Sequence, residues 1–129
     1  MKKIAPMQIV TNEVRIKNNN MPLGKFALSP KFTRKIGRLK GNRYFLELNV
    51  EIASTEERKT PLDLYISITG IFNLTLFPEE EREEYIKGEG LRILFPYLRT
   101  MVTNMTSSAL MPPLILPISD LSQTFGDKI

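Results

Sequence analysis

The chain has 129 residues, of which 42% are hydrophobic and 25% charged, a balance typical of one globular domain with a single core. It contains no cysteine and no histidine, which excludes disulfides and the metal and catalytic sites built on those side chains. Its net charge of +4 is uneven, because residues 1–43 hold eleven lysines and arginines and one acid. We therefore treat residues 1–129 as one domain and expect no metal and no cofactor.

The basic first third of the chain predicts two strands. Residues 7–17 alternate apolar and polar side chains, which is typical of a half-buried strand. Residues 18–24 are rich in Asn, Pro and Gly and predict a loop. Residues 25–33 alternate again, and Pro30 within them favours either a position at the edge of a sheet or a bulged strand. Residues 34–42 contain two glycines, so we expect them to form a connection.

The middle of the chain carries the clearest strand pattern. Residues 44–52 and 62–76 place an apolar side chain at nearly every second position, so each run predicts a strand with one buried face. The charged residues 54–60 between them predict a turn, and the two strands should pair as an antiparallel hairpin. Gly70 interrupts the second run without ending its alternation and predicts a bulge there.

Two helices should follow these strands. Residues 79–87 are acidic at their start and basic at their end, which suits a short helix that Gly88 and Gly90 should end. Residues 91–108 repeat apolar side chains at helical spacing and predict a longer helix.

The predicted helix 91–108 is apolar over more than half of its circumference. One face of a sheet covers only part of a helix, so we expect a second apolar surface from another subunit. Residues 110–118 contain three prolines and predict an extended return segment. Ser119 should then cap a last short helix.

Two other classes of function follow from the charge pattern. The basic segment is compatible with nucleic-acid binding, since the aromatic residues Phe26 and Phe32 lie among its lysines. Strands with one solvated face show the same alternation of basic and apolar residues. The consecutive carboxylates at 79–84 lack a histidine partner and resemble a solvated helix face, so we expect no enzyme. A basic nucleic-acid-binding module therefore stays open as an alternative.

Three motifs in the second half of the chain belong together. Residues 70–72 have the sequence GIF, residues 93–99 ILFPYLR and residues 113–118 PLILPI. In this order and spacing they resemble the SecB export chaperones, and the resemblance extends over residues 62–121.

The resemblance implies an α+β protomer with a four-stranded antiparallel sheet, one long helix and a short C-terminal helix. It implies a homotetramer, assembled as a dimer of dimers with the long helices between two sheets. It also implies a cytoplasmic, ATP-independent holdase that is not inserted in a membrane. Such a holdase binds unfolded preproteins or other non-native client chains in surface grooves.

The partner of the protein stays open. SecB proteins of the export pathway are acidic, whereas this chain is basic. The acidic position that docks the SecA motor in that family falls at Tyr65 here. The partner is therefore either SecA or, for a SecB-like chaperone dedicated to a toxin–antitoxin system, an antitoxin.

A holdase needs apolar grooves lined by adaptable side chains, and methionine suits that task because it is flexible and polarizable. The predicted client-binding residues are Met21, Leu23, Phe26, Leu28, Phe32, Met111, Leu114, Leu121 and Phe125. The predicted oligomer interface consists of Leu94, Tyr97, Leu98, Met101, Val102 and Met105. We expect no catalytic residue.

Overall fold

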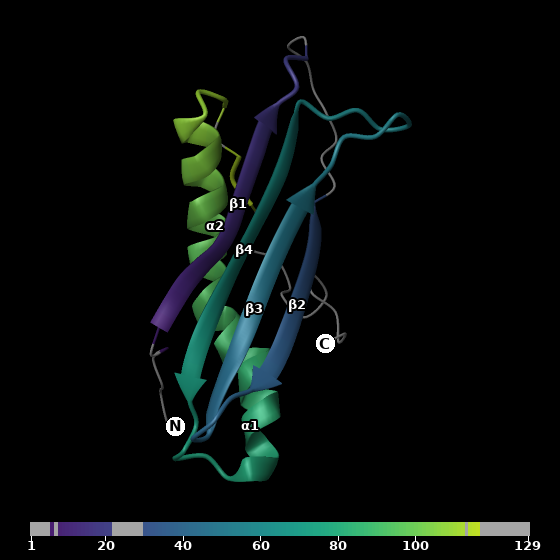
Figure 1. The fold of residues 1–129 in the computed structure, drawn as a ribbon. Helices are drawn as coiled ribbons and strands as arrows, with labels where there is room; N and C mark the ends of the chain where they lie inside the picture. Colours follow the sequence, from purple (N-terminus) through teal and green to yellow (C-terminus); the bar gives the residue numbers. More distant parts are fainter. Residues whose placement is uncertain (1–5, 7, 22–29, 113, 117–129) are drawn as a thin grey trace.

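The computed structural model describes residues 6, 8–21, 30–112 and 114–116, which form a four-stranded sheet with a helical layer on one face (Figure 1). The strands are β1 (Gln8–Asn18), β2 (Lys31–Arg38), β3 (Arg43–Ile52) and β4 (Leu62–Asn73). The helical layer consists of α1 (Glu79–Tyr85), a π-turn (Ile86–Gly90) and α2 (Leu91–Ser108). This order confirms the predicted α+β class; the short helix predicted from Ser119 lies outside the described residues.

The sheet is antiparallel throughout, with the strand order β1-β4-β3-β2. β3 and β4 form the predicted hairpin, in which Val50 lies opposite Ile66. β1 and β2 lie at opposite edges of the sheet, so the chain crosses from one edge to the other between residues 18 and 31. The edge position of β2, which begins directly after Pro30, confirms the interpretation of that proline.

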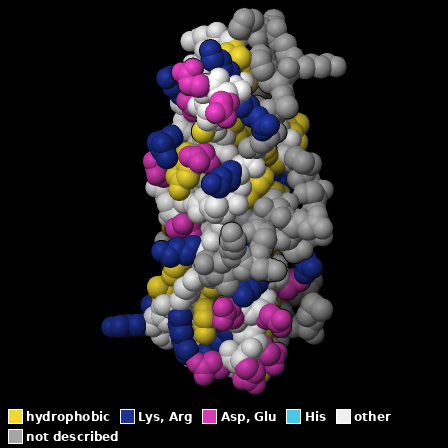
Figure 2. Space-filling view, turned by 90° about the vertical axis from the view of Figure 1, so that its right-hand side faces the viewer, with side chains coloured by type: hydrophobic (Ala, Val, Ile, Leu, Met, Phe, Trp, Pro, Cys, Tyr) yellow, Lys and Arg dark blue, Asp and Glu magenta, His cyan; other side chains and the backbone are white. Residues whose placement is uncertain are grey.

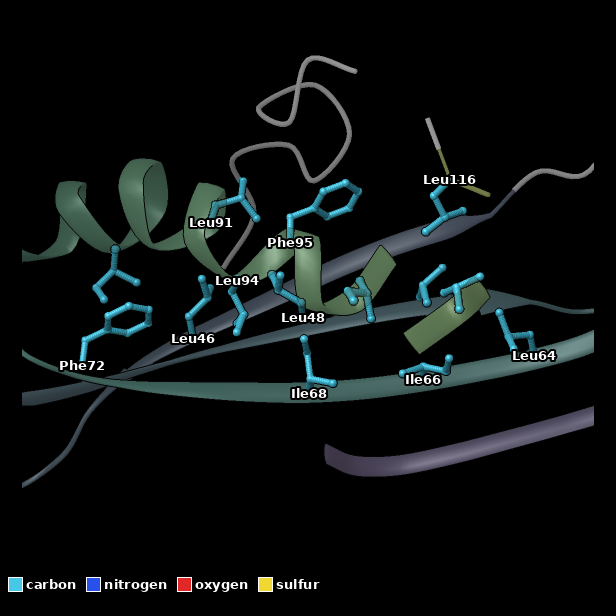
Figure 3. Packing of buried hydrophobic residues seen from close by; sticks show 14 of the residues in the cluster. Leu46, Leu48, Leu64, Ile66, Ile68, Phe72, Leu91, Leu94, Phe95 and Leu116 are labelled. Carbon is cyan, nitrogen blue, oxygen red and sulfur yellow. The ribbon is translucent and has the colours of Figure 1, made fainter. Parts of the chain in front are cut away.

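The core lies between the sheet and α2 (Figure 3). Successive side chains of a strand point to opposite faces, so β3 and β4 bury about every second residue. The sheet contributes Leu46, Leu48, Leu64, Ile66, Ile68 and Phe72, and the helical side contributes Leu91, Leu94 and Phe95. Each fully buried side chain of this size contributes about 1.5–3 kcal/mol, so this layer carries most of the stability of the fold.

β2 lies later in the sequence than predicted. Residues 34–38 were expected to form part of a connection, but they continue the strand and pair with β3 up to Arg38 opposite Tyr44. Gly37 is compatible with a strand because it lies opposite Phe45, and a Cβ at Gly37 would overlap the Phe45 ring. The aromatic ring covers the glycine, so this glycine does not mark a connection.

The bulge predicted at Gly70 was wrong. Gly70 pairs regularly with Ile9 on one side and Leu46 on the other, and the irregularity lies between Thr11 and Glu13 of β1. Gly70 instead allows α2 to approach the sheet closely, because a Cβ there would lie 3.1 Å from Cδ1 of Leu94.

The helical layer is continuous where a break was predicted. α1, the π-turn and α2 follow one another directly, and Gly90 has helical backbone angles (φ −58°, ψ −41°). Gly88 and Gly90 do not adopt the left-handed conformation with which a glycine ends a helix. The prediction was therefore wrong, because glycine permits a helix end without imposing one.

Two arginine side chains connect α1 to the end of β2 and to the turn between β2 and β3. Arg82 is buried; its Nε donates to the carbonyl of Phe77 (2.9 Å) and its Nη1 to Oδ1 of Asn42 (2.9 Å). Arg38, at the end of β2, pairs with Glu79 at 2.5 Å. The hydrogen bond and the charge of Arg38 lower the pKa of Glu79. The contribution of this pair to stability is therefore present at neutral pH and lost as the pH falls through the lowered pKa.

Candidate functional site

The structure describes four of the nine predicted client-binding residues. Met21, Phe32, Met111 and Leu114 are half-buried, and the last three pack against the rim of the core. The other five lie outside the described residues: Leu23, Phe26, Leu28, Leu121 and Phe125. The described side chains therefore lie between core and surface, and their part in a groove stays a prediction.

Phe32 closes the edge of the core between β2 and α2. Its ring lies 6.1 Å from that of Phe95 between centroids, with the planes tilted by 58°. Phe95 is only 3% exposed, whereas Phe32 remains half-buried. Phe32 pairs with Val50, which is buried on the helix-facing side, so its ring is not displayed on the open face of the sheet as an RNA-stacking aromatic would be.

A polar stripe on α2 binds the backbone of residues 114–116, which belong to the predicted return segment. Arg99 Nε donates to the carbonyl of Leu116 and Thr103 Oγ1 donates to the carbonyl of Leu114, both at 2.9 Å. The Leu114 amide donates to Thr106 Oγ1, also at 2.9 Å. The three side chains are three and four residues apart and therefore share one helix face. This stripe was not predicted, although the spacing of Arg99, Thr103 and Thr106 is visible in the sequence.

The stripe also sets which apolar side chains reach solvent. Leu116 is 2% exposed and Ile115 is 67% exposed, because neighbours in extended chain point to opposite sides. Leu110, just after α2, is 94% exposed and has a φ of 60°, a conformation that a helix end usually assigns to glycine. Sequence analysis missed Leu110 and Ile115, since nothing local distinguishes them from core residues.

Thr106→Val should loosen the return segment without creating a cavity in the core. Valine has nearly the same shape as threonine but cannot accept the hydrogen bond from the Leu114 amide. We expect the free energy of unfolding to fall by about 1–2 kcal/mol. Hydrogen exchange at Leu114 and urea unfolding measure these effects. Thr100→Val is the matched control, since Thr100 is exposed on α2. Equal exchange at Leu114 in both variants would contradict the fastening role.

The predicted interface residues divide between core and surface. Leu94, Leu98 and Val102 are 0% exposed within the single chain and belong to its core, so their assignment to an interface is corrected. Tyr97 is 51% exposed, and Met101 and Met105 are half-buried. A role of these last three in an interface stays a prediction.

The sheet face away from the helices carries a polar row that crosses all four strands. Asn49 donates to Thr33 Oγ1 (3.2 Å) and accepts from the Tyr65 hydroxyl (3.3 Å). Arg15 lies over the Tyr65 ring, 4.6 Å from its centroid, and pairs with Glu13 at 2.6 Å. The position at which the resemblance implies an acidic residue therefore carries an aromatic ring covered by a cation.

Charges of both signs are mixed over the described surface. Figure 2 shows lysines and arginines interspersed with acids on the face it presents. Among the described basic residues of the first third, Arg34 is buried on the helix side and Arg38 pairs with Glu79. This mixture does not favour nucleic-acid binding, which needs a continuous basic face.

Among the described residues, no acidic cluster could hold a metal ion and no helix is long and apolar enough to cross a membrane.

A sequence model of one protein family, described as preprotein translocase subunit SecB, matches residues 13–129. The chain belongs to the SecB family. The earlier resemblance, which rested on residues 62–121, is thereby confirmed and extended into β1.

Curated SecB proteins match most of this chain but only part of their own length. The protein-export protein SecB of Paramagnetospirillum magneticum is 31% identical over 90 residues, which are 70% of this chain and 57% of the relative. The protein of the same name in Anaplasma marginale is 32% identical over 91 residues, 67% of this chain and 50% of the relative. The chain thus spans about half the length of the curated SecB relatives that it matches.

The fold is also similar to a solved SecB-like structure. A SecB-like chaperone of Mycobacterium tuberculosis, in complex with a peptide from an antitoxin, superimposes with a TM-score of 0.74 and 17% sequence identity. The match covers 91% of each chain. This likeness confirms the SecB-like arrangement of the sheet and the long helix.

Proposed function

We propose that this SecB-family protein is an ATP-independent holdase that binds unfolded or non-native polypeptides in the cytoplasm, and that it is not an enzyme. The observation that carries the proposal is an apolar rim along α2. The rim consists of side chains that the core only partly covers or leaves exposed: Phe32, Leu110, Met111, Leu114 and Ile115. Membership of the SecB family supports it.

The apolar rim suits weak binding of many sequences. Burial of apolar surface contributes about 25 cal/mol per Å², so a few rim residues hold a client segment only weakly. One long client that occupies the grooves of several copies is held much more tightly, because the later contacts are intramolecular. We propose a homotetramer, a dimer of dimers, in which Tyr97, Met101 and Met105 lie at subunit contacts.

Suppression of aggregation tests the proposal. Without ATP, the protein should keep a chemically unfolded client soluble at a molar ratio below one tetramer per client molecule. Light scattering follows the aggregation. Leu110→Ser combined with Ile115→Ser should weaken client binding about fivefold or more, since two exposed apolar side chains are lost. Thermal unfolding should change little, because both side chains are exposed.

Leu76→Ser is the matched control for this pair. Leu76 is 68% exposed and precedes α1, at the opposite end of the helical layer from Leu110. It should leave client binding unchanged. Two results together would instead support the nucleic-acid-binding module: no suppression of aggregation, and binding of nucleic acid with an affinity that falls steeply as the salt concentration rises.

One observation favours a chaperone dedicated to a toxin–antitoxin system over one coupled to SecA. At the family's acidic docking position, Arg15 covers Tyr65, so an acidic docking contact has no counterpart there. The M. tuberculosis chaperone, similar in fold, was solved with an antitoxin peptide. Calorimetric titration of this protein with purified SecA should show no binding. Saturable binding of SecA would contradict this preference.

A further inference from the structure

The helical layer contains one irregular turn. The π-turn Ile86–Gly90 separates α1, of 7 residues, from α2, of 18 residues, and no side chain caps the N-terminus of α2 at Gly90. In a π-turn the backbone hydrogen bonds span five residues instead of four, so some backbone groups nearby lose their regular partners. Such turns recur at functional sites in helices.

The packing around position 88 does not require a glycine there. A Cβ built on Gly88 would have no atom within 4 Å, and its φ is not positive. Glycine weakens a helix relative to alanine, because it loses more backbone freedom on folding. At this position glycine therefore adds flexibility to the turn and relieves no clash.

Arg34 holds the π-turn from the sheet. Its side chain, on the helix-facing side of β2, is 7% exposed, and its Nη1 donates to the carbonyl of Lys87 at 3.1 Å. Among the described strands, β2 pairs only with β3, so it can shift more easily than the two central strands. A shift of β2 would therefore act on the π-turn through Arg34.

The helices on the two sides of the turn are fastened separately. Arg82 ties α1 to the Phe77 carbonyl and to Asn42, whereas Leu94 and Leu98 bury α2 against the sheet. A hollow of about 560 Å³ lies beside the turn, lined by Arg34, Phe77, Glu81, Glu84, Tyr85, Lys87 and Gly88. The hollow is open to solvent, so water can reach this side of the turn.

We propose that the π-turn is a joint between α1 and α2, and that Arg34 is the latch that holds it. In the latched state Arg34 binds the Lys87 carbonyl. In the released state water binds that carbonyl, and the angle between α1 and α2 changes. Phe32 lies two residues from Arg34 on the same face of β2, so a client held at Phe32 would displace the latch. Only this last step rests on the proposed function.

Hydrogen exchange of the full chain, followed by mass spectrometry without any client, tests the latch. Arg34→Met keeps much of the side-chain length but cannot donate to Lys87. We expect the amides of residues 86–92 to exchange at least about tenfold faster, which is the effect of losing one charged hydrogen bond. The amides of β3 and β4 should keep their rates. Arg38→Met, which removes an exposed ion pair of the same strand, is the matched control and should not change residues 86–92.

Gly88→Ala tests the joint independently of the latch. Alanine fits the space, so this variant should fold, and we expect slower exchange at residues 86–92. Unchanged exchange there in Arg34→Met, or an equal acceleration in β3 and β4, would overturn the latch. Unchanged exchange in Gly88→Ala would overturn the joint. If Arg34→Met does not fold, Arg34→Gln, whose side chain is too short to keep the bond to the Lys87 carbonyl, takes its place in the test of the latch. Because no client is present, failure of these experiments is distinguishable from failure of the holdase proposal.

Discussion

Leu98→Asp should destabilise the protein severely, with a loss of more than about 4 kcal/mol in the free energy of unfolding. Leu98 is 0% exposed in the layer between α2 and the sheet. Aspartate would remove its apolar contacts and place a carboxyl group where water does not reach. Domains have only about 5–15 kcal/mol of total stability, so a loss of this size removes a large part of it and should lower the unfolding temperature strongly. Circular dichroism during thermal and urea unfolding measures the effect.

Tyr97→Asp is the matched control for Leu98→Asp. Tyr97 is the neighbouring residue on α2 but is 51% exposed, so aspartate there remains hydrated and the protomer should stay folded. In the proposed tetramer the new charge should instead lower the mass measured by light scattering from about four times 14.8 kDa. Cooperative unfolding of Leu98→Asp at the original temperature would show that Leu98 does not lie in the core.

Arg82→Met should cause the second largest loss of stability, about 2–3 kcal/mol. Arg82 is buried and donates to the Phe77 carbonyl and to Asn42 Oδ1. Methionine fills much of the same space but leaves both acceptors without these donors. We expect α1 to loosen before the sheet, so hydrogen exchange should rise first in residues 79–85. Urea unfolding measures the total loss.

Arg38→Met is the control for Arg82→Met. Arg38 also ties the end of β2 to α1, but its pair with Glu79 is exposed, so the unfolding temperature should change little at neutral pH. The variant should also raise the pKa of Glu79 towards its ordinary value, because Arg38 is the main cause of the lowering. Carboxyl titration by NMR measures that change. If the two variants were equally destabilised, burial would not explain the role of Arg82.

The strands and the long helix show where local pattern was sufficient. β3 and β4 alternate because one of their faces is buried, and the same alternation is visible in the sequence. α2 has the predicted bounds, since its apolar positions repeat with the helical period. Glycine was the weak point of the prediction. Gly37, Gly70 and Gly88 were taken to interrupt elements, but the first two make room for Phe45 and Leu94, and the third lies within the π-turn.

The candidate site was harder to predict than the fold. Motif residues indicated the family, and the apolar composition of residues 110–118 pointed to the return segment. Leu94, Leu98 and Val102 were assigned jointly to the core and to an oligomer interface, because a helical stripe does not reveal which surface covers it; their burial within one chain places them in the core. Arg99, Thr103 and Thr106 were missed because their partners are backbone atoms of the return segment.

The sequence by itself determined the α+β class, the central hairpin, the long helix and the SecB family, since these depend on periodicity and motifs that are local in the chain. Only the tertiary structure decided the register of β2, the continuity of the helical layer and the roles of Arg34 and Arg82. The roles of the two arginines depend on hydrogen bonds between residues 53 and 40 positions apart. Which distant carbonyl or amide a buried arginine meets depends on how the layers pack, and no local pattern encodes it.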